Sequence, residues 1–290
     1  MQRIGIIANL EKENCREHLA SLSDWLATRG VEVRLLPEAV LAIEKPDLSA
    51  EPDALREATV IVVLGGDGTI LRALRLLDVD APPLLGVNLG GLGFLTEIPS
   101  DAAQGALERV LAGDFEVESR MMLEARLMDE GGSVLARYEG LNDAVLDSPF
   151  GRKMVKLTVS IAGEPPDRYS ADGIVIATPT GSTAYALAAG GPLLRPGLEA
   201  LVVVPLCAHR LSLRPLVVAP NEEVTAHVGN GGARLFMDGV AVNRLSAGQG
   251  ILVARSPRRA AFVRPTKRAF HTVLRQKLGW GGAPDPDGER

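Results

Sequence analysis

The sequence predicts two parts of different fold class: an N-terminal α/β domain with a doubly wound, mostly parallel sheet, and a β-rich, sandwich-like second domain. Apolar strands alternate with helical stretches through the first third of the chain, as repeated βα units do. Near Phe115 the pattern changes to short strands separated by turns. Aromatic residues make up only 4% of the chain, so Val, Leu, Ile and Ala must fill most of the core.

The elements of the first part follow from the spacing of its apolar residues. Apolar runs predict strands at residues 3–9, 31–36, 59–64 and 84–88. Helical spacing predicts helices at residues 13–29, 70–77 and 102–111. The β-branched run at residues 59–64 is continuous, which is typical of a strand buried on both faces in a parallel sheet.

Turn residues divide the second part into short strands. The turns fall at residues 131–132, 163–166, 220–221, 229–232 and 247–248, and residues 182–189 are the one stretch there that reads as a helix. Helical spacing returns at residues 265–278, and we expect that helix to belong to the first domain. The sequence thus predicts domains at residues 1–114 and 115–264, with a disordered tail at 281–290.

Composition and charge exclude several classes of protein. Acidic residues outnumber basic ones by 36 to 31, and the resulting charge of −5 argues against a general nucleic-acid binder. The two cysteines form no paired motif, so a disulfide framework or a zinc site is not expected. No run approaches the roughly 20 apolar residues of a membrane helix, and the apolar N-terminus is too short for a signal peptide. We therefore expect a soluble, cytoplasmic protein with no membrane partner.

The first motif is the turn Gly65-Gly66-Asp67-Gly68-Thr69, between a predicted buried strand and a helix. Open α/β sheets place their ligands at such turns, and the glycines let backbone N–H groups approach an anion. A carboxylate repels phosphate, so Asp67 is predicted to accept a proton from an attacking hydroxyl or to hold a divalent cation. The alternative is a tight turn with Asp67 as a helix N-cap. Arg72 is expected near the same turn, where it contacts a phosphate or offsets the negative charge of Asp67.

A second glycine cluster covers residues 90–97. It contains Gly-x-Gly but lacks the third small residue of the dinucleotide-binding fingerprint, and no P-loop pattern occurs in the chain. Two interpretations stay open for this cluster: a glycine-lined wall of the same crevice, or a purely structural turn.

Two further stretches predict a site for a nucleotide. Asn142 and Asp143 offer an amide for a base edge and a carboxylate for a ribose diol, although the pair taken alone is typical of an ordinary turn. Residues 172–192 run from a buried strand into a turn rich in hydroxyls and small residues, then into a short helix. Hydroxyls there can bond a polar ligand, and Tyr185 offers a face for a base. The chain has no Gly-x-Ser-x-Gly motif and no histidines with metal-ligand spacing.

Together, residues 65–69, 142–143 and 172–192 closely resemble the bacterial NAD kinase family, and the similarity runs from about residue 3 to residue 278. The first motif is shared with the diacylglycerol and sphingosine kinases. The stretch Thr178-Pro179-Thr180-Gly181-Ser182-Thr183-Ala184-Tyr185 is what separates the families. The resemblance implies an α/β domain with a β-sandwich, and a kinase that uses ATP with Mg²⁺ or another divalent cation to convert NAD to NADP. It also implies a homo-oligomer, a dimer or a tetramer.

The resemblance further implies roles for single residues. Asp67 is the proton acceptor for the 2′-hydroxyl of the adenosine ribose, with Gly68 and Arg72 near the phosphates. Asn142 and Asp143 hold the dinucleotide, and Asp172 lies toward the nicotinamide. The residues around adenine and ribose are Thr180, Thr183, Ala184, Tyr185 and Ala188.

The chain departs from the family's pattern at two places. Asp143 stands where the family usually has the longer Glu, and no basic residue occurs at positions 169–171, just before Asp172. Arg168 is the nearest substitute for that charge. Two other functions stay open on the sequence: a lipid kinase with the same first motif, and an NAD-binding sensor without activity.

Overall fold

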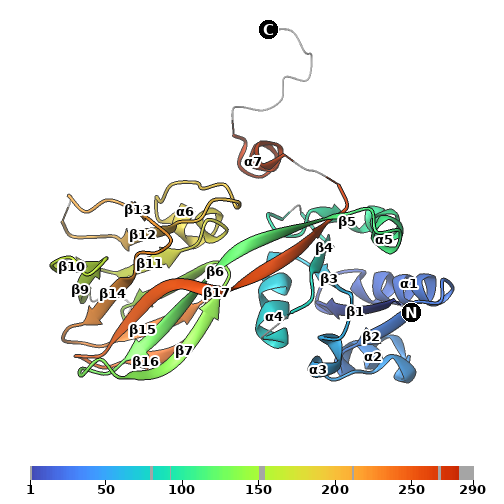
Figure 1. Cartoon of the computed structure of the whole chain (residues 1–290), viewed down its shortest axis with the longest axis horizontal. Coiled ribbons are helices and arrows are strands. Elements are labelled where there is room, and N and C mark those ends of the chain that lie inside the picture. Colours follow the sequence, from blue (N-terminus) through green and yellow to red (C-terminus); the bar gives the residue numbers. More distant parts are fainter. Residues whose placement is uncertain are drawn as a thin grey trace, which may run out of the picture. The chain divides into compact units, whose positions relative to one another are not determined.

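A computed structural model describes residues 2–78, 81–91, 93–149, 154–210, 212–266 and 269–280. The chain divides into two compact units, residues 1–119 with 261–290, and residues 120–260. Two long paired strands, β6 (Glu116–Met128) and β17 (Gly250–Arg264), each contribute residues to both units (Figure 1). The expected domain limits, after residues 114 and 264, remain predictions. The predicted disordered tail lies outside the described residues.

The first unit contains a sheet in the order β17-β4-β3-β1-β2. Its strands are β1 (Arg3–Ala8), β2 (Glu32–Leu35), β3 (Val60–Gly65), β4 (Leu84–Asn88) and the short β5 (Ile98–Pro99), which pairs with β4. The pairings among β1 to β5, and the pairing of β17 with β4, are parallel. β2 lies on one side of β1, and β3 and β4 follow on the other side, as in the predicted doubly wound sheet.

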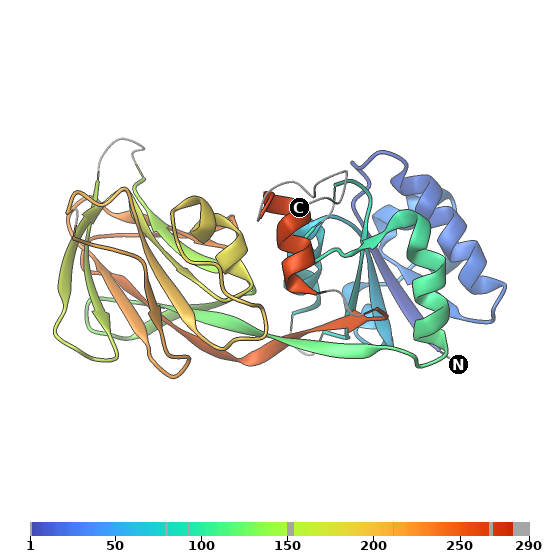
Figure 2. The same cartoon turned by 90° about the horizontal axis from the view of Figure 1, so that it is seen from above.

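Helices cover both faces of this sheet. The helices of the first unit are α1 (Cys15–Ala27), α2 (Pro37–Ile43), α3 (Pro52–Leu55), α4 (Asp67–Leu77), α5 (Ala103–Leu111) and α7 (Phe270–Leu278). Leu19 of α1 and Leu107 of α5 are fully buried in one cluster with Val62 of β3, so α1 and α5 share one face (Figure 2). The neighbouring residues of β3 point to the opposite face, where α4 packs against β3.

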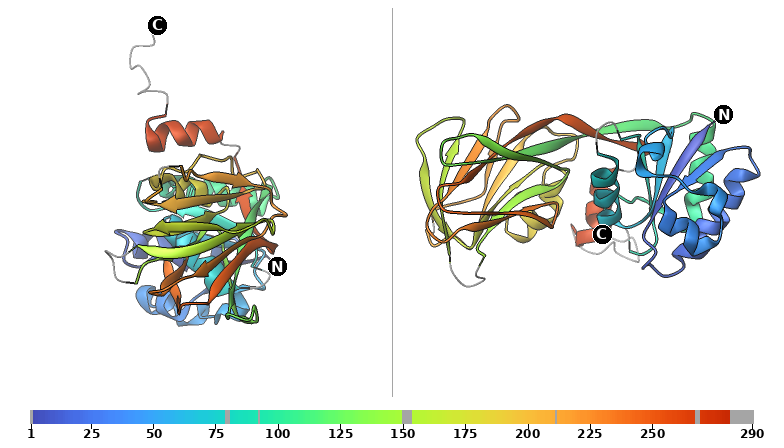
Figure 3. Two further views of the ribbon diagram at one scale, coloured as in Figure 1. Left: turned by 90° about the vertical axis from the view of Figure 1, so that its left-hand side faces the viewer. Right: turned by 90° about the horizontal axis from the view of Figure 1, so that it is seen from below.

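The second unit is a sandwich of two antiparallel sheets (Figure 3). One sheet has the order β10-β9-β14-β17 with β6 and β7 attached, and the other has the order β13-β12-β11-β8-β15-β16. The remaining strands of the first sheet are β7 (Val134–Gly140), β9 (Val155–Ile161), β10 (Asp167–Ala171) and β14 (Val224–Val228). Those of the second are β8 (Asp143–Asp147), β11 (Gly173–Ala177), β12 (Leu201–Leu206), β13 (Leu216–Val218), β15 (Ala233–Met237) and β16 (Val240–Leu245).

Strand β11 is buried on both sides, which positions the residues that follow it. Ile174 and Ile176 face the core between the sheets, whereas Val175 and Ala177 face a second cluster that includes Ala186 of the short helix α6 (Tyr185–Ala188). This explains the unbroken apolar run in the sequence. The architecture confirms the predicted fold class.

The elements differ from the prediction in two ways that concern the site. Helix α4 begins at Asp67 rather than near residue 70, because Gly66 is extended and serves as its N-cap. The predicted helix at 182–189 is instead a 3₁₀ turn, Gly181–Thr183, followed by α6. Periodicity of apolar residues does not detect a first helical turn made of Asp, Gly and Thr.

Candidate functional site

Asp67 lies in the first turn of α4, directly after the carboxyl end of β3. Its side chain does not cap the helix, so the alternative interpretation as an N-cap is wrong. The carboxylate instead turns toward the loop between β4 and β5. The pairing of Gly65 with Asn88 brings the ends of β3 and β4 together and thereby places this loop beside Asp67.

Four donors from this loop converge on the Asp67 carboxylate. Oδ1 accepts hydrogen bonds from the backbone N–H of Leu95 (3.0 Å), the backbone N–H of Thr96 (3.1 Å) and the Thr96 hydroxyl (3.1 Å). Oδ2 accepts one from the backbone N–H of Phe94 (2.8 Å). The second glycine cluster therefore binds the side chain of the first motif, which neither open interpretation of the cluster included.

Gly93 makes this close approach sterically accessible. A Cβ at this position would lie 2.1 Å from Oδ1 of Asp67 and 2.3 Å from Oγ1 of Thr96, well inside contact distance. Gly65 has a similar constraint, since its Cβ would lie 2.2 Å from Oγ1 of Thr69. A glycine is thus required at positions 65 and 93, because a polar side chain packs against the backbone at each of them.

The other two predicted residues of the first unit have different surroundings. Gly68 is exposed, with open space where a Cβ would stand. The Arg72 guanidinium donates to Oε1 of Glu38 at 2.7 Å, and both side chains are nearly half exposed. The structure therefore pairs Arg72 with an acidic residue of α2.

In the second unit, Asp238 organises the segment that contains Asn142 and Asp143. Its carboxylate accepts hydrogen bonds from the backbone N–H groups of Leu141 (2.9 Å), Asn142 (2.7 Å) and Asp143 (3.1 Å). Asp238 has a φ of 48°, in the left-handed region, at the turn between β15 and β16. The sequence interpretation missed this residue, although an Asp-Gly pair between two strands signals such a turn.

Asp143 is a buried carboxyl group, with 4% of its surface exposed. Burial, together with the negative charge of nearby Asp238, raises the pKa of Asp143 from 3.8 to about 7. The group therefore changes its charge near neutral pH, unlike an ordinary surface aspartate.

The hydroxyl-rich turn after β11 packs directly on this segment. The Thr178 hydroxyl donates to the carbonyl of Leu141 (2.5 Å) and accepts from the N–H of Gly181 (3.1 Å). A Cβ on Gly181 would lie only 2.0 Å from the carbonyl oxygen of Asn142. The Thr183 hydroxyl is used locally, since it donates to the carbonyl of Thr180 at 2.9 Å. Ala184 joins this turn to α6.

Two buried polar atoms of this region have no hydrogen-bond partner within the described part of the chain: Oδ1 of Asn142 and Oγ1 of Thr180. Buried polar atoms without partners are rare in native proteins and mark places where a ligand or water completes the structure. Both belong to residues that the sequence interpretation assigned to nucleotide binding.

A pocket of about 510 Å³ lies at one end of the same sheet. Among the residues predicted for the site, Asp172, Tyr185 and Ala188 line it. Its other lining residues are Asp147, Ser148, Ala189, Leu206, Cys207 and Arg234. Arg234 holds Asp147 by two hydrogen bonds of 2.9 and 2.6 Å. Arg234 thus brings a basic group to this pocket, a role for which the sequence suggested only the exposed Arg168.

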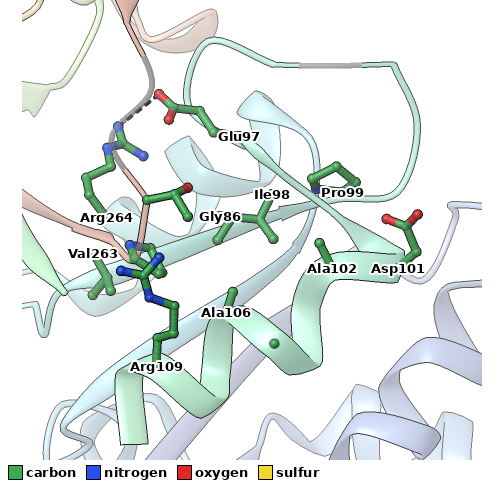
Figure 4. A pocket seen from close by; sticks show the side chains of 13 residues that line it. Gly86, Glu97, Ile98, Pro99, Asp101, Ala102, Ala106, Arg109, Val263 and Arg264 are labelled. Carbon is green, nitrogen blue, oxygen red and sulfur yellow. Dashed lines mark ion pairs between the residues drawn. The ribbon is translucent and has the colours of Figure 1, made fainter. Parts of the chain in front are cut away.

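The first unit has its own cavity, of about 420 Å³, beside α5 and the end of β17 (Figure 4). Arg264 lies there 3.4 Å from Glu97, and its Nε donates to Glu118 at 2.7 Å. Arg109 donates to Asp114 at 2.8 Å. Both arginines of this cavity are therefore paired with carboxylates of the chain itself.

Within the described ranges, no three His, Cys, Asp or Glu side chains are grouped to hold a metal ion. No helix of those same ranges is long and apolar enough to cross a membrane.

Comparison with known proteins identifies relatives over almost the whole chain. Residues 4–115 match the ATP-NAD kinase N-terminal domain, and residues 141–265 match the ATP-NAD kinase C-terminal domain. An NAD kinase of Moorella thermoacetica is 38% identical over 289 residues, which cover 99% of this chain and 92% of that protein. An NAD kinase of Gemmatimonas aurantiaca is 41% identical over 248 residues, which cover 84% and 86%.

Solved structures are similar in fold as well. A yeast NADH kinase complexed with NADH has a TM-score of 0.91 at 25% identity, covering 99% of this chain and 90% of that one. An NAD kinase from Archaeoglobus fulgidus in complex with ATP has a TM-score of 0.76 at 27% identity, covering 95% and 98%.

Proposed function

The chain belongs to the ATP-NAD kinase family, and on that premise we propose that it transfers the γ-phosphoryl group of ATP to the 2′-hydroxyl of the adenosine ribose of NAD. The product is NADP. The observation that carries the proposal is the ionisable carboxylate of Asp67, held by four hydrogen bonds at the end of β3. A lipid kinase would share the first motif, but the match of residues 141–265 to the ATP-NAD kinase C-terminal domain supports NAD instead.

Asp67 acts in this proposal as the general base. A sugar hydroxyl is a weak nucleophile until its proton is removed, and a carboxylate within hydrogen-bond reach can accept that proton as the new O–P bond forms. The loop at residues 93–96 fixes the carboxylate in one orientation before substrate arrives, so no reorganisation is needed during the reaction.

The second unit supplies the groups that bind NAD. Asn142 and Thr180 each present a buried polar atom that lacks a partner within the described residues, and the polar edges of a nucleotide can satisfy both. Tyr185, half exposed, presents its ring for stacking on a base. Asp143 bonds a ribose hydroxyl, as an acceptor when ionised or as a donor when protonated. Thr183 and Ala184 shape the wall beside it, and Asp172 and Ala188 contribute from the pocket.

ATP enters with Mg²⁺ or another divalent cation. Such a cation would neutralise charge on the transferred phosphoryl group, and Mg²⁺ is commonly bound through one or two carboxylates together with substrate phosphates and water. Gly68 leaves open space beside its backbone for the phosphates. Arg72 reaches a phosphate only if it leaves Glu38, which an exposed ion pair permits at little cost.

We propose also that the protein is cytoplasmic and forms a homo-oligomer. Size-exclusion chromatography with light scattering tests the oligomeric state.

The decisive experiment is Asp67→Asn, assayed for NADP formation from NAD with ATP and Mg²⁺. The variant keeps shape and loses the base, so we expect turnover to fall by about 10²–10⁴-fold. NAD binding, measured by calorimetry, should stay within about threefold. Asp53→Asn, an exposed change on α3, is the matched control and should keep full activity.

The outcomes separate the alternatives. Unchanged turnover in Asp67→Asn would refute the role of Asp67. A wild-type protein that binds NAD but makes no NADP with ATP would instead be a sensor. The same assay with polyphosphate as donor, or with NADH or diacylglycerol as acceptor, defines the substrates.

A further inference from the structure

A chain of buried hydrogen bonds leads from Asn88 through Thr96 to Asp67. Nδ2 of Asn88 donates to the Thr96 hydroxyl at 3.0 Å, and that hydroxyl lies 3.1 Å from Oδ1 of Asp67. Thr96 is fully buried and Asn88 nearly so. No water is needed to complete the chain, since each step is within direct hydrogen-bond distance.

The direction of this chain follows from the partners of Asn88. Its Oδ1 accepts from the backbone N–H of Gly90 at 2.7 Å, and its Nδ2 donates to the carbonyl of Gly91 at 2.7 Å. These bonds fix the amide orientation. The Thr96 oxygen therefore receives a hydrogen from Asn88, and its own hydrogen must point to the Asp67 carboxylate, which has none to give when ionised.

The two oxygens of Asp67 are consequently not equivalent. Oδ1 accepts three hydrogen bonds, two from backbone N–H groups and one from the Thr96 hydroxyl. Among the residues that the structure describes, Oδ2 accepts one, from the backbone N–H of Phe94. A carboxylate oxygen has about two lone-pair positions, so Oδ1 is fully used whereas Oδ2 keeps one acceptor position.

We propose that Thr96 is a positioning residue for phosphoryl transfer, and that Oδ2 of Asp67 is the atom that receives the proton. This inference rests on the proposed function of Asp67 as the base. In the step, the 2′-oxygen forms its bond to the γ-phosphorus while the bond from that phosphorus to the bridging β,γ-oxygen breaks. The departing electron pair leaves on ADP, and the hydroxyl proton moves to Oδ2. Thr96 touches none of the reacting atoms.

The test is Thr96→Val, which removes the hydroxyl and keeps the branched shape. Hydrogen bonds to charged groups are among the stronger ones, and a misplaced catalytic group costs up to about 100-fold. We therefore expect kcat to fall roughly 10- to 100-fold while the dissociation constant for NAD changes less than threefold. Thr96→Ser retains the hydroxyl and should recover kcat to within about threefold of the wild type.

Two comparisons distinguish positioning from loss of stability. Ser23→Ala deletes another buried hydroxyl of the first unit, which donates to the carbonyl of Leu19, and should leave kcat unchanged. Thr96→Val is also made in the Asp67→Asn background, where no carboxylate remains to be positioned. There the added change should alter the residual rate less than twofold.

Each result supports or overturns a defined claim. An equal loss of rate from Thr96→Val in both backgrounds overturns the positioning role and indicates a general structural one. If Thr96→Val is fully active while Asp67→Asn is slow, the positioning role of Thr96 is also overturned, and the proposed role of Asp67 as the base stands. Full activity of Asp67→Asn overturns the proposed function itself.

Discussion

The buried carboxyl group of Asp143 makes the stability of the protein depend on pH in a calculable way. An unfolded chain ionises this group near its ordinary pKa of 3.8, whereas the folded chain retains the proton until a pKa of about 7. Between these values unfolding releases a proton, so the folded state loses stability as the pH rises. At about 1.36 kcal/mol per pH unit, the folded state loses on the order of 4 kcal/mol of stability in total, and this loss is complete above about pH 7.

Asp143→Asn removes this titration and leaves an uncharged side chain of the same size. We expect the free energy of unfolding of the variant, minus that of the wild type, to increase by roughly 2–4 kcal/mol between pH 5 and pH 8. Urea unfolding followed by circular dichroism, at each pH for both proteins, measures the difference. Asp172→Asn, the same substitution at an exposed carboxylate of the same unit, is the matched control.

The sign of the change is the critical result. A difference for Asp143→Asn that is constant across this pH range, or that falls toward pH 8, would refute the assignment of a raised pKa to this residue.

Three further substitutions test the packing around the site. Gly181→Ala places a Cβ 2.0 Å from the carbonyl oxygen of Asn142 and should lower the free energy of unfolding by about 1–3 kcal/mol and weaken NAD binding at least tenfold by calorimetry. Thr178→Val leaves the buried carbonyl of Leu141 without its donor and should cost about 1–3 kcal/mol in urea unfolding, with a weaker affinity for NAD. Leu19→Ala, in the core of the first unit, should cost about 2–5 kcal/mol and leave kcat unchanged at a temperature where the variant is folded.

The sequence predicted those parts of the site that are continuous in the chain. The strand, turn and helix around Asp67 could be predicted because buried runs and glycines have local signatures, and the residues from Thr178 to Tyr185 form one recognisable stretch. What surrounds these residues could not be predicted in the same way. The donors to Asp67 include three backbone N–H groups, which every non-proline residue possesses, so no residue type signals them.

Long-range partners were missed for a second reason. Asp238 supports Leu141 from 97 positions away, and the pairing of β15 with β8 is what brings the two together. Arg234 reaches its pocket through the same strand pairing. Neither contact has a local pattern, so only the sheet register reveals it.

The division of the chain also determines the order in which the protein can fold during synthesis. Residues 120–260 are continuous, so all residues of the second unit are present once that stretch has left the ribosome. The first unit must wait, because its strand β4 pairs with Phe262 near the end of β17. During translation the part of the β4 edge that faces Phe262 therefore stays uncovered until residue 262 has been made. Unpaired strand edges of this kind are prone to aggregate. A chain that ends after residue 260 would contain every residue of the second unit but would lack Phe262, the residue of β17 that pairs with β4.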